Sequence, residues 1–338
     1  MFKKFIFVVL SLLFGIGLLY IAFEKIGYQD IVSTISVLNY AQLILILCIF
    51  IFILIIGTFR WNIALKTQHI KHISFFNILT AKTIGHSINY LTPISLIGGQ
   101  SFKAVILKEK AKIPLEKIII SIFIEEFIFL FVVFLFIISG IIFLFTHWTL
   151  PYIFNLFLFL ALLVFIISFY FIYFKIIKKT KDKKGFFVFF VELLRLDKIK
   201  MINGVKDNIA YIEDEIALFF KHQKIKTIEI ALLSIIEMLL LLSSYALTIF
   251  FLKQELGIGQ IFSVNALIHL VSCVPIPASL GSFEWSQVFI FSIFGLSASS
   301  AIGFALIIRI VNLIIALFGI ILLFHFQIKT IFKKIFGK

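Results

Sequence analysis

Long apolar runs separated by short polar or basic segments are the main pattern along this chain. Six of these runs are long enough to cross a bilayer as helices, because about 20 apolar residues span its hydrocarbon core. The predicted spans are Phe5–Phe23, Ala41–Phe59, Ile118–Phe145, Tyr152–Phe174, Thr227–Leu252 and Ala301–Phe324. The runs lack the period-two alternation of barrel strands, so the pattern predicts an all-α integral membrane protein.

Two further apolar stretches contain residues that break helices. The first, Ile70–Lys117, has a break from Pro93 to Gly98-Gly99, and the second, Ile258–Phe294, has one from Pro277 to Gly281. Irregular backbone at membrane depth is tolerated where protein encloses it. We therefore predict that each stretch forms a re-entrant helical hairpin, which enters the membrane and returns to the same side.

The order of these elements predicts an inverted repeat. Residues 1–150 read span, span, hairpin, span from the inside, and residues 151–338 repeat the order from the outside. The second half also holds a cytoplasmic amphipathic insert at 175–226, whose apolar residues recur every three or four positions and whose charged residues, among them Glu213, fill the other faces. Interrupted helices in matching positions of two inverted halves are typical of transporter sites. The alternative is a chance match of Pro and Gly residues in loops.

Composition supports the membrane assignment and limits the partners. The 338 residues are 62% hydrophobic and 14% charged, with a net charge of +14. Because the lysines flank apolar runs, this charge indicates orientation and contact with anionic lipid headgroups, and we predict no nucleic-acid partner. We expect both termini on the cytoplasmic side of a cell (inner or plasma) membrane. The block Lys175–Lys184 either attracts anionic lipid or serves only as a topology signal.

Polar side chains within the apolar segments gather around the two breaks. A charge near the bilayer centre costs at least ~2.5 kcal/mol, so each such residue is a functional candidate. The predicted substrate-binding residues are Lys82, His86, Asn89, Pro93, Gly98, Gly99, Gln100, Lys103, Glu125, Glu126, Pro277, Gly281, Glu284, Arg309 and Asn312. The alternative is that the charges pair with one another, for example Glu125 with Lys82 or Glu284 with Arg309, and only hold the hairpins.

The chemistry of these residues suits capture of a lipid headgroup. Backbone N–H groups at Gly98-Gly99 could hold a phosphate, and Lys82, Lys103 and Arg309 would supply positive charge. Either carboxylate of Glu125-Glu126 could hold an amine or a coupling proton. Arg60, beside Trp61, fits an ordinary interface anchor.

Enzymatic motifs are few. The sequence has no nucleophile elbow, no HExxH and no CxxC, and its two cysteines have no metal-ligand spacing, so we predict no cofactor and no metal. A membrane-embedded lipid or glycan-lipid transferase that uses Glu125 or Glu126 as a base stays open. A third reading is a non-catalytic membrane subunit that anchors a partner.

Four motifs resemble those of one family. They are RWNIAL (60–65), SINYLTPISLIGGQSFKAVIL (87–107), IEE (124–126) and VPIPASLGSFEW (274–285) followed by Arg309. Together they resemble the flippase-like membrane region of lysylphosphatidylglycerol synthases and its stand-alone relatives. The resemblance implies a multi-pass membrane protein that translocates or handles a phospholipid or lipid-linked headgroup between leaflets.

Two departures from that family affect the expected activity. The chain has no soluble aminoacyl-transferring domain, so the resemblance implies that lysyl transfer is absent. The family commonly has Arg soon after the Gly-Gly pair, whereas this chain has Lys103, which keeps the charge but loses the bidentate fork. The identity of the headgroup and a possible homo-oligomer are left open.

Overall fold

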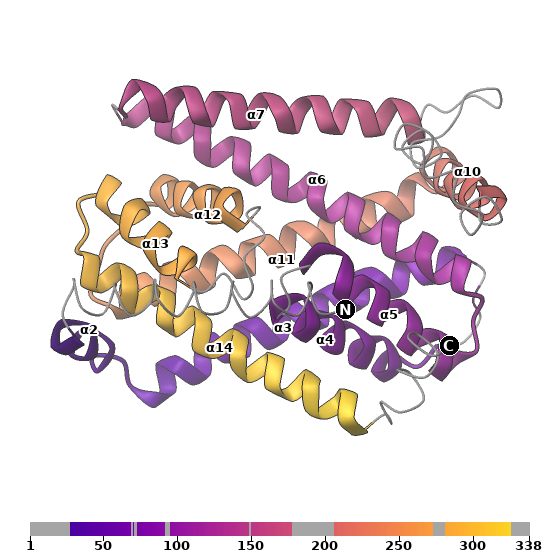
Figure 1. The fold of residues 1–338 in the computed structure, drawn as a ribbon, viewed down its shortest axis with the longest axis horizontal. Coiled ribbons are helices and arrows are strands. Elements are labelled where there is room, and N and C mark those ends of the chain that lie inside the picture. Colours follow the sequence, from indigo (N-terminus) through magenta and orange to yellow (C-terminus); the bar gives the residue numbers. More distant parts are fainter. Residues whose placement is uncertain are drawn as a thin grey trace, which may run out of the picture.

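The fold is helical throughout the described part of the chain (Figure 1). The computed structural model describes residues 28–68, 70, 73–91, 95–148, 150–177, 206–272 and 281–325. Within these residues, five helices are long and apolar enough to cross a membrane: α3 (Tyr40–Thr67), α6 (Leu115–His147), α7 (Tyr152–Ile172) with its π-helical continuation η1 (Tyr173–Ile177), α11 (Lys224–Phe251) and α14 (Ala298–His325). The prediction of an all-α membrane protein is confirmed, and the predicted span Phe5–Phe23 lies outside the described residues.

Helix α3 shows how local chemistry sets the element boundaries. The Asn39 side chain accepts a hydrogen bond from the Gln42 backbone N–H, and the Gln42 side chain accepts one from the Asn39 N–H, each at 2.9 Å. This reciprocal cap satisfies N–H groups that would otherwise lack partners. No Pro or Gly follows Phe59 in the helix, which continues to Thr67. Arg60 therefore lies two turns inside α3, and the predicted end of this span at Phe59 is wrong.

Two pairs of shorter helices lie where the hairpins are predicted. Helices α4 (Phe75–Leu91) and α5 (Ser95–Ala111) pack against each other, as do α12 (Ile258–Ser272) and α13 (Ser282–Ile293) (Figure 1). A helix of 17 residues, the length of α4 and of α5, is about 25 Å long. That is less than the ~30 Å hydrocarbon core, so these helices are too short to be ordinary spans. Their placement in a bilayer stays a prediction.

The break in the first pair is shorter than the sequence predicts. Only residues 92–94 separate α4 from α5, and Gly98-Gly99 lie inside α5. The prediction that this Gly-Gly pair belongs to the break is therefore wrong. Gly99 instead allows the two helices to approach, because a Cβ atom there would collide with the Gly85 carbonyl oxygen and with the Asn89 side chain.

Part of the predicted amphipathic insert forms α10 (Lys206–His222). Its apolar residues Ile216 and Phe219 are buried, and the helix packs on α6 and η1. An amphipathic helix of this kind can lie on the bilayer surface or pack on the inner side of the bundle, and α10 packs on the bundle. The expectation that Glu213 faces away from the apolar side is wrong, because Glu213 is fully buried.

The two halves of the chain are interlocked by close helix packing. Helix α14, in the second half, packs against α4 in the first and against the short helix α2 (Tyr28–Ile35). At the α4–α14 contact, Gly319 has no room for a Cβ atom beside Ser87. Small residues at such crossings are typical of membrane helix bundles, where close backbone approach replaces the hydrophobic driving force. Helix α14 thus lies between the first hairpin pair and α13.

Candidate functional site

A buried network of six charged side chains connects five helices in the first half of the bundle. The cations are Arg60 on α3, Lys82 on α4 and Lys103 on α5, and the carboxylates are Glu125 and Glu126 on α6 and Glu237 on α11. The formal charges of the six sum to zero. Burial of ionised groups away from water is costly unless they are paired, so this balance is what allows the network to persist.

Glu125 is the shared carboxylate of the network. Its Oε1 atom lies 2.8 Å from Arg60 Nη2 and 2.5 Å from Lys82 Nζ, and Glu125 is fully buried. Arg60 Nη1 also lies 3.1 Å from Glu237 Oε2 and donates to Ser234 Oγ at 3.3 Å. The predicted alternative pairing of Glu125 with Lys82 is confirmed, with Arg60 as a second partner.

Lys82 reaches this carboxylate because α3 presents a glycine to it. Lys82 Nζ donates to the Gly57 carbonyl oxygen at 2.8 Å, and a Cβ atom on Gly57 would lie 2.6 Å from the Lys82 ammonium. Arg60 is held from the other side by Phe129, whose ring centroid is 4.1 Å from the guanidinium carbon. A cation over an aromatic face in a desolvated site is favourable. These contacts fix both cations around Glu125.

The Lys103–Glu126 pair forms the more accessible edge of the network. Lys103 Nζ lies 2.9 Å from Glu126 Oε1, and Gln100 Nε2 donates to the same oxygen at 2.9 Å. The side chain of Glu126 is 26% exposed, whereas that of Glu125 is completely buried. Adjacent residues on a helix point about 100° apart, so α6 places one carboxylate in the interior and the other at an opening.

Asn89 holds the first hairpin pair together. Its Oδ1 atom accepts a hydrogen bond from the Gly99 N–H at 2.8 Å, which links α4 to α5. That N–H group is consequently occupied, and the expected role of free N–H groups at Gly98-Gly99 as a phosphate cradle is not supported at Gly99.

A second buried ion pair lies in the other half of the bundle. Arg309 Nε on α14 donates to Glu284 Oε1 on α13 at 2.6 Å, as the pairing alternative predicts. Glu284 is in the first turn of α13, just after Gly281, whose φ of 72° suits a residue without a side chain. The other oxygen of the same carboxylate, Oε2, is buried and has no hydrogen-bond partner among the described residues.

Helix α4 connects the two charged groups. Lys82 belongs to the network, and two turns further along the helix Tyr90 interacts with Arg309. Between them, His86 is close to Lys103 and to Asn312 of α14. The polar side chains of α4 thus reach different partners: Asn89 contacts α5, and Lys82 contacts α3 and α6.

Helices α12 and α13 add further buried polar groups. Asn265 is fully buried, and neither atom of its side-chain amide has a hydrogen-bond partner in the described part of the chain. Gln287, one turn after Glu284, is also fully buried, and its Oε1 atom has no partner there. Buried polar groups are normally satisfied by protein or water, so these atoms indicate a polar interior.

Two of the six charged residues of the network, Arg60 and Glu237, are not among the predicted substrate-binding residues. Arg60 fits an interface anchor while α3 is assumed to end at Phe59, and the real helix length places it in the interior. Glu237 stands out only as a lone charge in an apolar run, and Ser234 and Gly57 carry no sequence signal of their own. The available signal for Arg60 is the motif RWNIAL (60–65), which is one of the four motifs that resemble the family.

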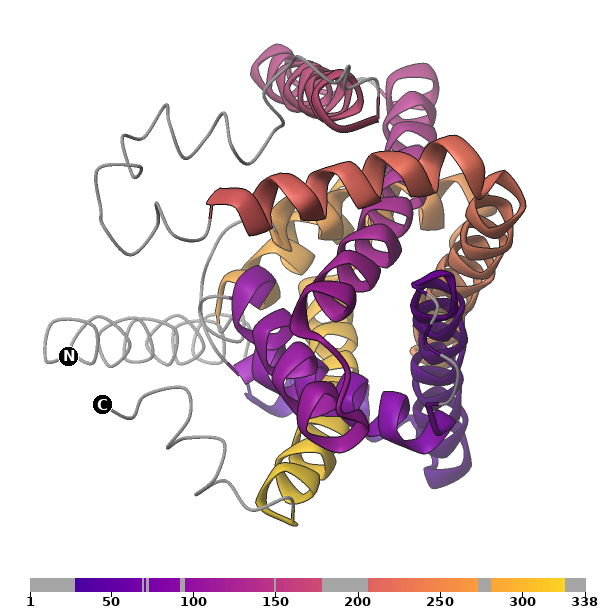
Figure 2. The same cartoon turned by 90° about the vertical axis from the view of Figure 1, so that its right-hand side faces the viewer.

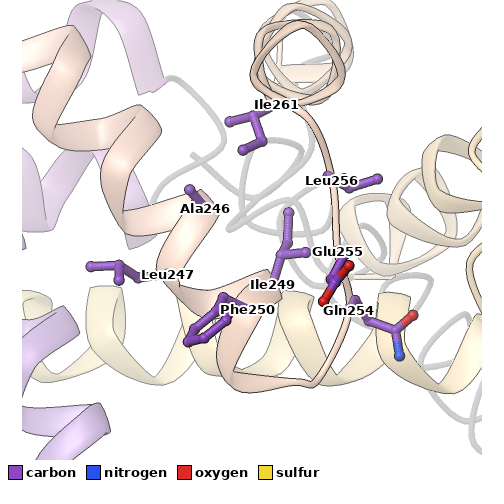
Figure 3. Close-up of a pocket in the computed structure, with 8 residues that line it drawn as sticks. All are labelled: Ala246, Leu247, Ile249, Phe250, Gln254, Glu255, Leu256 and Ile261. Carbon is purple, nitrogen blue, oxygen red and sulfur yellow. The ribbon is translucent and has the colours of Figure 1, made fainter.

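Other predicted features lie away from this site or outside the described residues. Pro93 and Pro277 are outside them, as are both termini and most of the Lys175–Lys184 block. A surface pocket of about 430 Å³ at the end of α11, lined by Phe250, Glu255 and Ile261 among others, contains none of the predicted site residues (Figure 3). Within the described ranges, no group of three His, Cys, Asp or Glu residues could hold a metal ion.

The fold and its interior define a multi-pass membrane protein with buried, balanced charge between its helices. The chain matches the family model of the lysylphosphatidylglycerol synthase TM region over residues 8–319. This match covers nearly the whole sequence, so the chain belongs to that flippase-like family, and the resemblance seen in its motifs is confirmed. A search of curated proteins and a search of solved structures each returned no match.

Proposed function

We propose that this protein moves a phospholipid, or another lipid with a phosphate-containing headgroup, between the leaflets of a cell membrane. The observation that carries this proposal is the neutral six-charge network with one partly exposed pair, Lys103 and Glu126. A charged headgroup that crosses hydrocarbon needs partners at depth, because desolvation of an unpaired charge is costly. In a network whose charges are already paired, the phosphate or amine of a headgroup can replace one protein charge as the partner of another at little electrostatic cost.

The accessible pair suits both ends of a zwitterionic headgroup. A phosphate can take the place of Glu126 on Lys103, while Glu126 accepts an amine from the same headgroup. Gln100, which donates to Glu126, can donate equally to a phosphate oxygen. The inner part of the network, around Glu125, would stay intact and hold α3, α4, α6 and α11 in place.

The second ion pair gives the headgroup a further contact. Arg309 can bind phosphate with two parallel N–H bonds when it exchanges its Glu284 partner. Helix α4 connects the two positions through His86 and Tyr90. Among the described residues, the amide of Asn265 and one oxygen each of Glu284 and Gln287 have no hydrogen-bond partner, which supports a hydrated interior on the side of α12 and α13.

In this proposal the two short helix pairs are re-entrant hairpins of an inverted repeat. Their lengths and their positions after the second span of each half support that arrangement. Single cysteines at Ser95 and at Ser282, in a chain with Cys48 and Cys273 replaced by Ser, test it with a membrane-impermeant thiol reagent. The proposal requires labelling of Ser95→Cys and Ser282→Cys from opposite sides, and labelling of both from one side would overturn it.

The activity is tested by transfer of fluorescent phospholipid between leaflets of reconstituted liposomes. Lys103→Ala and Arg309→Ala should each abolish transfer, while Lys253→Ala, an exposed lysine at the far end of α11, should keep it. All three variants are first checked for equal insertion. Normal transfer by both site variants would refute the proposal.

A membrane-embedded transferase is the competing function, and lipid analysis after gene deletion separates the two. Loss of a lipid species would indicate synthesis, whereas an unchanged species on the wrong leaflet would indicate transport. Transport is favoured by the contacts of Glu126. Its Oε1 atom lies 2.9 Å from Lys103 Nζ, so a cation already occupies the oxygen that a general base would use.

A further inference from the structure

An apolar groove lies on the opposite side of α6 from the charged network. It has a volume of about 410 Å³ and is lined by α6, the end of α7 with η1, α10 and the start of α11. Its wall is aromatic: the Phe127 ring lies 5.5 Å from Phe220 and 6.0 Å from Phe169, centroid to centroid. In Figures 1 and 2, α7 runs along the edge of the bundle, so the groove is next to the position of lipid.

The groove ends where helices reach the membrane interface. Thr227, in the first turn of α11, and Tyr173, at the start of η1, line it at one end. Tyr170 also lines it, and tyrosine side chains near helix ends are typical of the headgroup level, where an apolar ring meets a polar region. The other end reaches the α6 residues Phe131 and Ile128, which lie several turns into a span.

The interface end of the groove has a basic rim. Lys224 is on the same face of α11 as the lining residues Thr227 and Ala231, three and seven positions earlier. Lys221 directly follows Phe220, and Lys175 follows Tyr173 by two residues. Lys221 and Lys224 are exposed, whereas Lys175 is partly buried, with its Nζ 5.9 Å from the centroid of the Phe171 ring.

Acidic residues do not cancel this rim. Glu229 is bound at 2.8 Å by Lys226, so that pair is neutral and adds nothing on balance. Asp214 and Glu215 are on α10 but lie more than one turn before Phe220. The rim therefore carries a net positive charge from the exposed Lys221 and Lys224.

We propose that this groove binds an anionic phospholipid, with an acyl chain on the aromatic wall and the phosphate at the lysine rim. The combination of an apolar channel and a positive mouth at the headgroup level matches the two parts of such a lipid. A zwitterionic phospholipid would fit the channel but gain little from the rim. This site is separate from the Lys103–Glu126 pair and does not depend on the proposed transport.

Mass spectrometry of the intact full-length protein tests the site directly. The protein is titrated in detergent with phosphatidylglycerol or phosphatidylcholine of the same chains. Wild type should retain phosphatidylglycerol on the order of 25-fold better, because each of the two exposed rim lysines contributes on the order of a fivefold preference for an anionic headgroup. Lys221→Gln/Lys224→Gln should lose most of that preference, and the matched double variant Lys66→Gln/Lys108→Gln should keep it.

Filling the groove tests the apolar half of the site without a change in charge. Ala231→Phe should reduce retention of both lipids, and Thr227→Phe at the mouth provides a second variant if the first fails to fold. Unchanged phosphatidylglycerol retention in the folded groove variant would overturn the proposal, as would an unchanged preference in Lys221→Gln/Lys224→Gln. Leaflet transfer should persist in Lys221→Gln/Lys224→Gln, which separates failure of this site from failure of the proposed function.

Discussion

Among substitutions that keep side-chain size, loss of the shared carboxylate Glu125 should lower the stability of the protein most. Glu125→Gln keeps the side-chain shape and one oxygen, but it removes the negative charge that pairs with Arg60 and Lys82, whose nitrogen atoms lie 2.8 and 2.5 Å from Glu125 Oε1. The network then has three cations and two carboxylates, all in a buried site. Breaking one side of a buried ion pair typically costs about 3–5 kcal/mol, because the remaining charge is desolvated and uncompensated.

The expected loss can be measured as a shift of the thermal midpoint. At roughly 2 °C per kcal/mol for a large chain, Glu125→Gln should lower Tm by about 6–10 °C in detergent, at a fixed scan rate. Trp61, whose Nε1 donates to Ser121 Oγ at 3.1 Å beside the network, provides an intrinsic fluorescence signal. Neutralising a cation at the same time, as in Lys82→Met/Glu125→Gln, should recover part of the loss, since the charge balance returns.

The matched control is Glu229→Gln, which makes the same chemical change in an exposed pair. Glu229 and Lys226 also lie 2.8 Å apart, but their side chains are 38% and 43% exposed. Surface pairs contribute about 0–1 kcal/mol, so Tm should change by no more than about 2 °C. If Glu125→Gln lowers Tm no more than Glu229→Gln does, the network does not hold the bundle and the reasoning fails.

Three further changes test the packing and the accessible edge of the network. Gly57→Ala should destabilise the protein by about 1–3 kcal/mol, because its Cβ atom would lie 2.6 Å from Lys82 Nζ. The control Gly257→Ala should be neutral, because the nearest atom to its Cβ would be 3.6 Å away. Equal thermal midpoints of the two variants would contradict this expectation. Asn89→Leu should cost about 1–3 kcal/mol by leaving the Gly99 N–H without its acceptor, measured by the same unfolding assay, and an unchanged Tm would show that water replaces the bond. Glu126→Gln should lower Tm less than Glu125→Gln yet reduce leaflet transfer in liposomes, and full transfer would remove Glu126 from the proposed path.

Helix α10 illustrates where pattern reasoning succeeds and fails. The spacing of Ile216 and Phe219 predicts an apolar face, and both residues are buried. Glu213 is one turn before Ile216 and is buried with it, although the sequence pattern predicts this charged residue on another face of the helix. Periodicity describes the average of a helix face, whereas burial of one carboxylate depends on neighbours that come from other helices.

The sequence by itself determined the helical class, the spans and the two short interrupted stretches, because apolar run length and helix-breaking residues act locally. It also singled out most of the charges that the structure buries between helices, and it supplied the two pairings Glu125 with Lys82 and Glu284 with Arg309 as alternatives. Only the tertiary structure decided that Arg60 is central, that Gly99 packs within a helix, and that Glu237 completes the balance. These depend on five helices approaching one another, and the chain positions of Arg60, Lys82, Glu125 and Glu237 are too far apart for local pattern to connect them.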